Sequence, residues 1–212
     1  MPVATEWLVF LAAAALFAVL PGPGMLYVLA RSLRGGRAEG VRSVVGNGIG
    51  ALGHVVAAAI GLSALLAASA TAFTVLKLLG AGYLIYLGVR ALLERDGSEA
   101  GRVVEPAGRR RANRSAVTQG IVSELLNPKT ALFFLAFLPH FVHPGPVPAP
   151  LVFALLGTIA VVMTVAVDLV VAAFAGGIGA RLMGSRRWRG RQRVASGLTM
   201  IGLGGALALA ER

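Results

Sequence analysis

Residues 8–30 read LVFLAAAALFAVLPGPGMLYVLA, and this run contains no charged side chain. A membrane-crossing helix needs roughly 20 mostly apolar residues, so the run predicts a crossing over about residues 7–30. The sequence PGPG occupies positions 21–24, in the middle of the run, although proline and glycine are the residues that a helix interior tolerates least. We therefore expect a transmembrane helix that is broken near its centre.

The composition of the whole chain also places it in the membrane class. Of its 212 residues, 57% are hydrophobic and only 14% are charged, whereas soluble domains are about 45–50% apolar and about 25% charged. The absence of cysteine excludes disulfides and thiolate catalysis, and three histidines with few carboxylates argue against a metal site or cofactor. Because no Lys or Arg precedes the first apolar run, we interpret that run as mature structure rather than a cleaved signal.

Apolar runs predict five further crossings, at about 43–68, 72–92, 115–138, 151–175 and, in a shorter run, 194–210. The arginines lie in the loops and helix ends that follow the first, third and fifth crossings, and only Arg212 lies elsewhere. This alternation follows the positive-inside rule for an even number of crossings with both termini on the periplasmic side. The net charge of +11 is thereby explained by orientation in the membrane rather than by a nucleic-acid partner.

Six crossings divide into two halves of three, and because three is odd the halves lie in opposite orientations, as in inverted-repeat transporters. The fourth crossing has its own interruption, Asn127-Pro128-Lys129, at a depth similar to that of PGPG. The predicted fold class is an all-α integral membrane protein of six transmembrane helices, an inverted 3+3 repeat with helices 1 and 4 broken. One domain covers residues 1–212, with repeats at about 1–93 and 115–212 around a basic loop at 94–114.

A broken helix exposes backbone groups that can bind a ligand. Pro21 and Pro23 lack N–H groups, and residues before proline leave the helical region, so Leu20 and Gly22 are expected to be extended. The freed carbonyls near the end of the first half-helix suit an ammonium, and the N–H groups that begin the second suit a carboxylate. A zwitterionic amino acid carries both groups. The alternative is a proline kink with a packing role only.

Four ionisable side chains lie inside the predicted crossings, namely Lys77, Glu124, Lys129 and Asp168. Charged groups at membrane depth normally face a cavity, a partner or a relay. We predict that Asp168 carries a coupled proton, and the alternative is a structural ion pair with Lys129 or Lys77. For Lys77, the alternative to a functional role is snorkelling toward the headgroups.

The polar residues around these groups allow more than one role. Glu124 and Asn127 share a helix face, and Glu124 either contacts an amino group or pairs with Lys129. Lys129 begins the second half-helix, where its charge opposes the dipole, so it needs an acidic partner or attracts the substrate carboxylate. Asn47 either bonds to the broken backbone of the first crossing or reaches the substrate. His54 is interpreted as a hydrogen-bonded interior histidine, with a proton relay as the alternative.

Several segments resemble the LysE/RhtB family of bacterial amino-acid exporters. They are PGPG in the first crossing, LKLLGAGYLIYLGVRALL at 76–93, QGIVSELLNPKTALFFLAFLPHFV at 119–142, VAVDLV at 165–170 and RVASGLTMIGLGGALAL at 193–209. The resemblance covers nearly the whole chain in order, and NPK-x-x-LFF-x-x-FLP is a specific segment. It implies a six-helix inner-membrane protein that exports amino acids or related small amines, driven by the proton gradient. Cargoes in the family range over basic, polar and apolar amino acids.

We therefore interpret the chain as a secondary active exporter of amino acids or closely related small amines from the cytoplasm, by proton antiport with alternating access, in the bacterial inner membrane. The predicted substrate-binding residues are Pro21, Gly22, Pro23, Gly24, Asn47, Glu124, Asn127, Pro128 and Lys129, with Asp168 for proton coupling. The expected partners are the amino acid, protons and the lipid bilayer; a homo-oligomer stays open. The alternatives are an accessory or structural membrane protein without transport and, although no enzyme is expected, an intramembrane enzyme using Asp168 and His54.

Overall fold

The computed structural model describes residues 2–93, 115–175 and 186–209. Within these ranges the chain is all-helical, as predicted, and forms no strand. The α-helices are α1 (Ala4–Val19), α2 (Pro23–Ala57), α3 (Ser63–Ala68), α4 (Ala70–Leu93), α5 (Ala116–Leu125), α6 (Pro128–Leu132), α7 (Ala149–Phe174) and α9 (Arg186–Leu209). A π-helical turn (Ala58–Leu62) joins α2 to α3, and a π-helical turn (Phe133–Phe137) and a 3-10 turn (Leu138–Phe141) extend α6.

The chain leaves α1 and enters α2 at the prolines. α1 ends at Val19 and α2 begins at Pro23, at the first helical position, where the missing N–H removes no helical hydrogen bond. Leu20 (φ −68°, ψ 122°) and Gly22 (φ −130°, ψ −179°) are extended, which confirms the conformation expected of residues that precede proline. Two separate helix ends therefore meet at residues 20–22.

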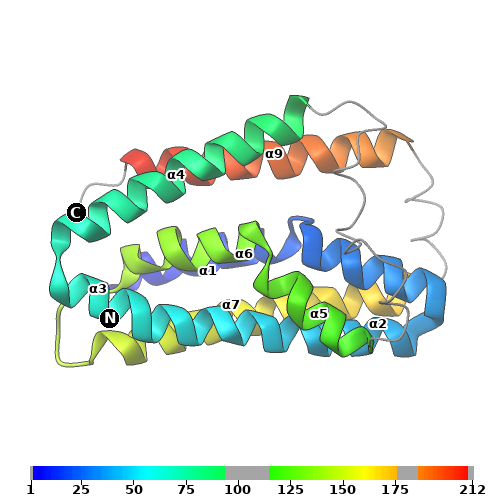
Figure 1. Cartoon of the computed structure of the whole chain (residues 1–212), viewed down its shortest axis with the longest axis horizontal. Helices are drawn as coiled ribbons and strands as arrows, with labels where there is room; N and C mark the ends of the chain where they lie inside the picture. Colours follow the sequence, from blue (N-terminus) through cyan, green and yellow to red (C-terminus); the bar gives the residue numbers. More distant parts are fainter. Residues whose placement is uncertain (1, 94–114, 176–185, 210–212) are drawn as a thin grey trace.

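Helix α2 reverses direction within its length. Gly36 has φ 75° and ψ −174°, a left-handed backbone conformation that glycine adopts without steric cost. In Figure 1 the first part of α2, in blue, runs to one end of the molecule, and the second part returns along the bundle. Beside this turn, Glu39 pairs with Arg31 at 2.5 Å and with Arg42 at 2.8 Å. The two parts of α2 are thus antiparallel segments joined at one glycine.

The chain also changes direction between α5 and α6. α5 ends at Leu125, α6 begins at Pro128, and the segments on either side are bent by 45°. Asn127 caps α6, because its side-chain oxygen accepts the backbone N–H of Lys129 at 3.1 Å. This second helix end is therefore closed by a side chain of its own.

An aromatic core lies between α1, α7 and the turns that follow α6. Phe10, Phe133, Phe141 and Phe153 are among the largest fully buried side chains. The rings of Phe17 and Phe133 stack with their centroids 4.2 Å apart. This stack joins the last turn of α1 to the segment after α6, so the core brings the two interruptions of the chain together.

Helices α4 and α9 form a pair beside this body (Figure 1). They pack closely at Gly88 and Gly197, since a Cβ atom on Gly88 would lie 2.6 Å from the carbonyl oxygen of Gly197. α9 begins at Arg186, so the prediction of a short helix from residue 194 was wrong at its start. Arginine is a good helix former, and a polar composition therefore does not end a helix.

Several helices are suited to a membrane. By length and composition, Pro23–Leu65 and Ala149–Phe174 can cross one, and Ala116–Leu125 with Pro128–Phe141 adds a third if the bent pair is one crossing. Ala4–Val19 and Leu78–Leu93 are shorter apolar helices. Large apolar side chains point outward from many of these helices, as a lipid-facing surface requires.

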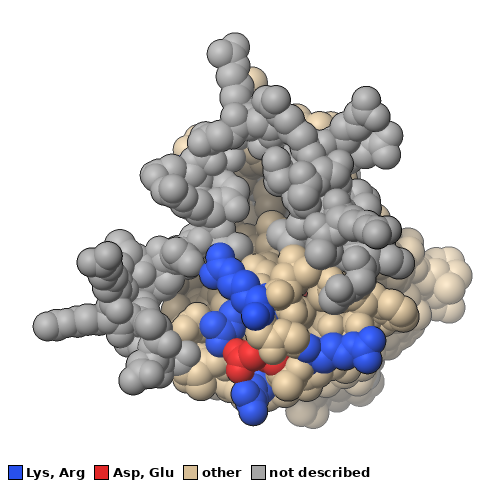
Figure 2. Space-filling model, turned by 90° about the vertical axis from the view of Figure 1, so that its right-hand side faces the viewer, with Lys and Arg blue, Asp and Glu red and all other residues tan. Residues whose placement is uncertain are grey.

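Basic side chains gather at the end of the molecule where α2 turns. Figure 2 looks at this end and shows Lys and Arg around a small acidic patch. Arg31 and Arg42 flank Glu39 there, and Nε of Arg37 donates to the carbonyl oxygen of Ala173, near the end of α7, at 3.0 Å. The arginines that follow the first apolar run thus lie at the same end as the last turn of α7.

Candidate functional site

The two interruptions of the chain lie against each other. A Cβ atom on Gly22 would lie 2.8 Å from Cδ of Lys129. A Cβ atom on Gly24 would overlap Oε2 of Glu124 and lie 3.1 Å from Nδ2 of Asn47. Neither glycine has a positive φ, so their backbone conformations are open to other residues. Glycine is needed at both positions because side chains from other helices approach the backbone closely.

The ammonium of Lys129 is bound by backbone carbonyls of the first interruption. Its Nζ donates to the carbonyl oxygens of Phe17 at 2.6 Å and Leu20 at 2.5 Å, and it lies 4.2 Å from the centroid of the Phe17 ring. In a continuous helix the carbonyl of Phe17 would pair with the N–H of residue 21, which Pro21 does not have. The proline thus creates the acceptor that Lys129 uses.

This arrangement differs from the ion pair that the sequence suggested for Lys129. Among the described residues, no ion pair joins Lys129 to Glu124 or Asp168. The C-terminal end of α1 carries a negative partial charge, and a cation at such an end is stabilised by roughly 0.3–1 kcal/mol. The end of α1 therefore offsets the unfavourable position of Lys129 in the first turn of α6.

Buried Glu124 holds the side chains of the second interruption together. Its Oε1 accepts a hydrogen bond from the hydroxyl of Thr130 at 2.5 Å, and its Oε2 accepts one from Nδ2 of Asn127 at 3.1 Å. The backbone carbonyl of Glu124 lies 3.1 Å from Nε2 of His54. This contact gives the half-buried His54 a hydrogen-bond partner, and the choice between a structural role and a proton relay stays a prediction. Both functional groups of the Asn127 side chain are engaged within the interruption, one by Glu124 and one by the N–H of Lys129.

Asp168 of α7 lies beside Asn47 of α2, deep in the protein. The two residues are 2% and 4% exposed, and Nδ2 of Asn47 lies 3.3 Å from Oδ2 of Asp168. In the described part of the chain, Oδ1 of each residue has no hydrogen-bond partner. An unsatisfied buried acceptor costs about 1–3 kcal/mol, so the pair can stabilise an additional donor such as a bound proton or an ammonium.

These contacts decide between some of the alternatives. Asn47 bonds to Asp168 and not to the broken backbone between α1 and α2. Asp168 forms its described hydrogen bond with Asn47, and the ion pair with Lys129 is not formed among the described residues. The side chain of Lys77 lies outside the described part of the structure, so the ion pair suggested for it stays a prediction.

The structure thus brings most of the predicted site residues into one region. Gly22, Gly24, Asn47, Glu124, Asn127 and Lys129 lie in contact, and Asp168 joins them through Asn47. Pro21, Pro23 and Pro128 shape the two helix ends. The region offers carbonyl and carboxylate oxygens, which suit a cation, and one ammonium, which suits an anion.

The freed carbonyls near Phe17 and Leu20 were expected from the sequence, whereas the ring of Phe17 and the hydroxyl of Thr130 were not named. Phe17 supplies both a carbonyl and a ring to the ammonium of Lys129, and Thr130 donates to Glu124. The signal for Phe17 was its position four residues before Pro21, which identifies the one carbonyl that loses its partner to that proline. Thr130 has a polar side chain in the first turn after Pro128, close to Glu124 in sequence, and this clustering was the signal available for it.

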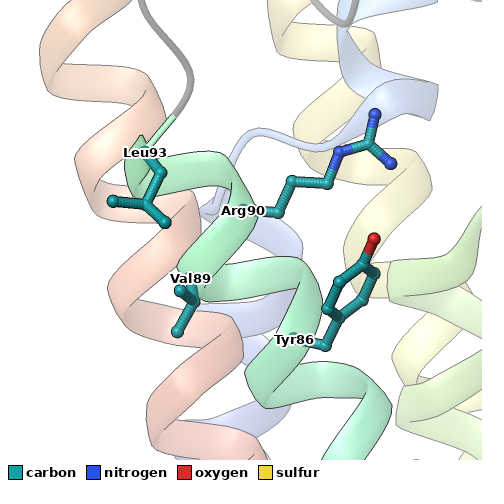
Figure 3. A pocket seen from close by; sticks show the side chains of 4 residues that line it. All are labelled: Tyr86, Val89, Arg90 and Leu93. Atoms are coloured by element: carbon teal, nitrogen blue, oxygen red, sulfur yellow. The ribbon is translucent and has the colours of Figure 1, made fainter.

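A separate surface recess lies on α4. It has a volume of about 320 Å³ and is lined by Tyr86, Val89, Arg90 and Leu93. Figure 3 shows that all four lining side chains come from a single helix. None of the predicted site residues lines it. Among the described residues, no group of three or more His, Asp or Glu side chains could hold a metal ion.

Comparison with known proteins provides independent information. An uncharacterized membrane protein of Vibrio cholerae is 31% identical over 138 residues, 65% of each chain. The homoserine/homoserine lactone efflux protein of Salmonella typhimurium is 30% identical over 209 residues, 97% of each chain. The leucine efflux protein of Salmonella choleraesuis is 30% identical over 136 residues, 63% of this chain and 61% of its own. No solved structure matches.

The family comparison covers both interruptions and the residues between them. The model of the LysE type translocators matches residues 15–211, from the last turns of α1 to beyond the end of α9. The matched relatives include bacterial membrane proteins and efflux proteins, and members of the family are translocators rather than enzymes. A match of this extent, together with a relative aligned over 97% of the chain, establishes that the protein belongs to the LysE type translocator family.

Proposed function

We propose that this protein exports amino acids or closely related small amines from the cytoplasm, by proton antiport with alternating access. The observation that carries the proposal is the polar contact between the two interruptions, where Lys129 meets the carbonyls of Phe17 and Leu20 and buried Glu124 meets Gly24. Irregular backbone and charged side chains at membrane depth are tolerated where they are buried in protein or line a pathway. The family match and the efflux proteins among the relatives support an exported small molecule.

The proposed membrane topology has six crossings in an inverted 3+3 repeat. α1 with the first part of α2 (about residues 7–35) forms the first broken crossing, and α5 with α6 and its extension forms the fourth. The remaining crossings are the second part of α2 with α3, then α4, α7 and α9. The arginines near the turn of α2 support a cytoplasmic position for that end, which would put both termini on the periplasmic side of the inner membrane.

The proposed substrate site lies between the two interruptions. Carbonyls at the end of α1 and the carboxylate of Glu124 suit the amino group of an amino acid, and Lys129 suits its carboxylate. Homoserine and leucine both carry these two groups, whereas homoserine lactone, which the name of the first relative also includes, keeps the amino group but has its carboxyl group closed into a ring ester. The amino group is common to all three compounds, and the carboxylate adds a second contact for the two free amino acids.

Asp168 is the proposed proton carrier. Its carboxylate is buried and one of its oxygens has no partner in the described structure, so binding a proton there removes both a charge and an unsatisfied acceptor. Asn47 lies between Asp168 and Gly24, which connects the protonation site to the substrate site. Protonation and cargo binding would then change the same group of contacts and favour opposite states of the transporter.

A transport assay tests the proposal. Purified full-length protein is reconstituted in liposomes preloaded with labelled homoserine or leucine, and the external pH is lowered. We expect the pH gradient to accelerate efflux over protein-free liposomes, and a protonophore to remove the acceleration. If a panel of all common amino acids gives no gradient-driven flux, the accessory membrane protein is the better reading.

An Asp168→Asn variant tests the role of the carboxylate. Asparagine keeps the size and the contact with Asn47 but cannot exchange a proton in the physiological range. We expect exchange of labelled for unlabelled cargo to persist while gradient-driven efflux falls to the level of protein-free liposomes. Gradient-driven efflux at the wild-type rate would show that the proton is carried elsewhere.

A further inference from the structure

The binding place of the Lys129 ammonium is built almost entirely from backbone. Two carbonyl oxygens accept its hydrogens at 2.6 and 2.5 Å, and the face of the Phe17 ring lies 4.2 Å away. These features match any primary ammonium, because an R–NH₃⁺ group offers several N–H donors and a positive charge to an aromatic face. The amino group of an amino acid is chemically the same group as the end of the lysine side chain.

We propose that the carbonyl end of α1 is the amine subsite of the transporter, and that Lys129 occupies this subsite as a tethered substitute when cargo is absent. Cargo binding displaces the lysine ammonium, and the cargo amine takes over its hydrogen bonds to Phe17 and Leu20. This inference rests on the proposed export function and specifies how the same site recognises its substrate.

The path of the lysine side chain supports displacement. Lys129 is only partly buried, and its aliphatic chain passes directly over Gly22, where a Cβ atom would lie 2.8 Å from Cδ. The long side chain of lysine can retract without moving the backbone of α6. The absence of a side chain at position 22 leaves room for the lysine chain to lie against the backbone of the first interruption.

The exchange also accounts for the carboxylate of the cargo. A zwitterion brings one positive and one negative group, so the displaced Lys129 ammonium can pair with the incoming carboxylate. The carbonyl end of α1 stays neutralised throughout, and no uncompensated charge is left at membrane depth. The chemical class that fits is therefore a zwitterionic α-amino acid, and an amine without a carboxylate would leave Lys129 without its new partner.

Chemical rescue of a Lys129→Met variant tests the subsite without requiring transport. Methionine has a length similar to lysine but leaves the two carbonyls without a cation. The full-length protein in lipid nanodiscs is titrated with ethylammonium, tetramethylammonium or ethanol at constant ionic strength. We expect ethylammonium to raise the melting temperature of Lys129→Met by about 5 °C near 100 times its Kd. Tetramethylammonium has no N–H group and ethanol has no charge, so neither should reproduce the effect.

The controls distinguish a specific site from a general salt effect. Wild type and Lys129→Arg keep a cation at the carbonyls and should respond weakly to ethylammonium. Gly82→Ala, on an open face of α4 with no neighbour near the new Cβ, should behave like wild type. No ethylammonium response in Lys129→Met, or an equal response in wild type, would overturn the amine subsite.

A second variant covers the case in which Lys129→Met does not fold. Gly22→Ala keeps the charge but places a Cβ against the lysine side chain, so it disturbs the seated position of the ammonium. We expect its melting temperature to respond to ethylammonium more strongly than that of wild type. Equal responses of Gly22→Ala and wild type would contradict displacement of Lys129.

Transport kinetics separate this inference from the export function itself. If Lys129 fills the subsite about nine-tenths of the time, its removal should raise the affinity for ethylammonium, which has no carboxylate to pair with Lys129, about tenfold. Ethylammonium should then inhibit Lys129→Met and not wild type. Wild-type export without either effect in the variant would overturn the subsite and leave export intact. Ethylammonium rescue in a protein that moves no amino acid would support the subsite and contradict export.

Discussion

The two interruptions of the chain contribute different chemical groups to the contact between them. The first, at PGPG, supplies bare backbone: carbonyls at the end of α1 and the exposed main chain of Gly22 and Gly24. The second supplies side chains, with Asn127 closing the helix end and Glu124 joining it to Thr130. Each interruption therefore lacks what the other provides. Two interruptions that lie against each other do not have to be equivalent, and here the first supplies backbone acceptors and the second supplies charged side chains.

This division makes Glu124 the most sensitive position in the second interruption. Glu124→Ala leaves the buried donors of Asn127 and Thr130 without their acceptor, at about 1–3 kcal/mol for each. We expect the largest loss of melting temperature among the single variants of the two interruptions, measured by thermal unfolding in detergent. Glu124→Gln keeps the shape and one acceptor oxygen, so it should retain more stability. Equal losses for the two variants would show that charge, rather than acceptor capacity, stabilises the interruption.

Substituting the two glycines separately compares the contacts across the interface. In Gly24→Ala the new Cβ overlaps a buried, hydrogen-bonded carboxylate and crowds Asn47, which predicts a cost of about 1–3 kcal/mol. In Gly22→Ala it meets the middle of a flexible lysine side chain, so the loss of stability should be smaller. Thermal unfolding measures both, with Gly82→Ala as the control. A greater loss in Gly22→Ala would reverse the assignment of the tighter contact.

The cap of the second interruption should have a smaller effect. Asn127→Ala removes the acceptor for the N–H of Lys129, and loss of an N-cap typically costs about 1 kcal/mol. Asn127→Ser restores a capping oxygen but cannot reach Glu124, so it should recover part of that loss. The difference between the two variants, measured by thermal unfolding, isolates the cap. If serine recovers nothing, the side chain contributes through Glu124 alone.

The smallest effect is expected at the contact between Glu6 and His143, which joins the start of α1 to the loop that follows the extension of α6. Glu6, which precedes the first crossing, contacts Nε2 of His143 at 2.8 Å and accepts the N–H of Val3 at 2.9 Å. The Val3 hydrogen bond, together with His143, holds the pKa of Glu6 below its usual value of 4.5. A lowered carboxyl pKa contributes stability above pH 4.5 that is lost as the pH falls through the lower, folded value.

The lowered pKa of Glu6 predicts the direction in which stability changes with pH. Relative to Glu6→Gln, wild type should lose stability as the pH falls below about 4.5, which thermal unfolding would measure. The loss in free energy of unfolding should be less than about 1 kcal/mol, because exposed ion pairs contribute little. Above that pH the difference between the two proteins should be constant. A difference that grows as the pH rises from 4.5 toward 6 would contradict a lowered pKa of Glu6.

The prolines made the end of α1 and the start of α2 predictable from the sequence. Pro21 and Pro23 remove N–H groups and force their preceding residues out of the helix, so the end of α1 follows from the sequence alone. Hydropathy likewise indicated the main apolar helices. The start of α9 was misjudged because arginines before residue 194 were read as a loop, although polarity is compatible with a helix that extends beyond an apolar core.

The partners of the polar residues could not be predicted in the same way. Lys129 meets the carbonyl of Phe17 across 112 residues of sequence, and Asn47 meets Asp168 across 121. Each pairing depends on how whole helices pack, and one charged side chain can form hydrogen bonds or ion pairs with several kinds of partner. For Lys129 the sequence suggested an acidic partner. The freed carbonyls at the end of α1 were expected to suit an ammonium, but not the one that Lys129 carries.

The turn of α2 at Gly36 has a mechanical consequence. The reversal is made at a single residue, and the Glu39 carboxylate pairs with Arg31 across the turn and with Arg42 on its own segment. We therefore expect a tilt of the segment that starts at Pro23 to move the segment that carries Asn47. Opening of the first interruption and displacement of Asn47, the neighbour of Asp168, would then be parts of the same movement.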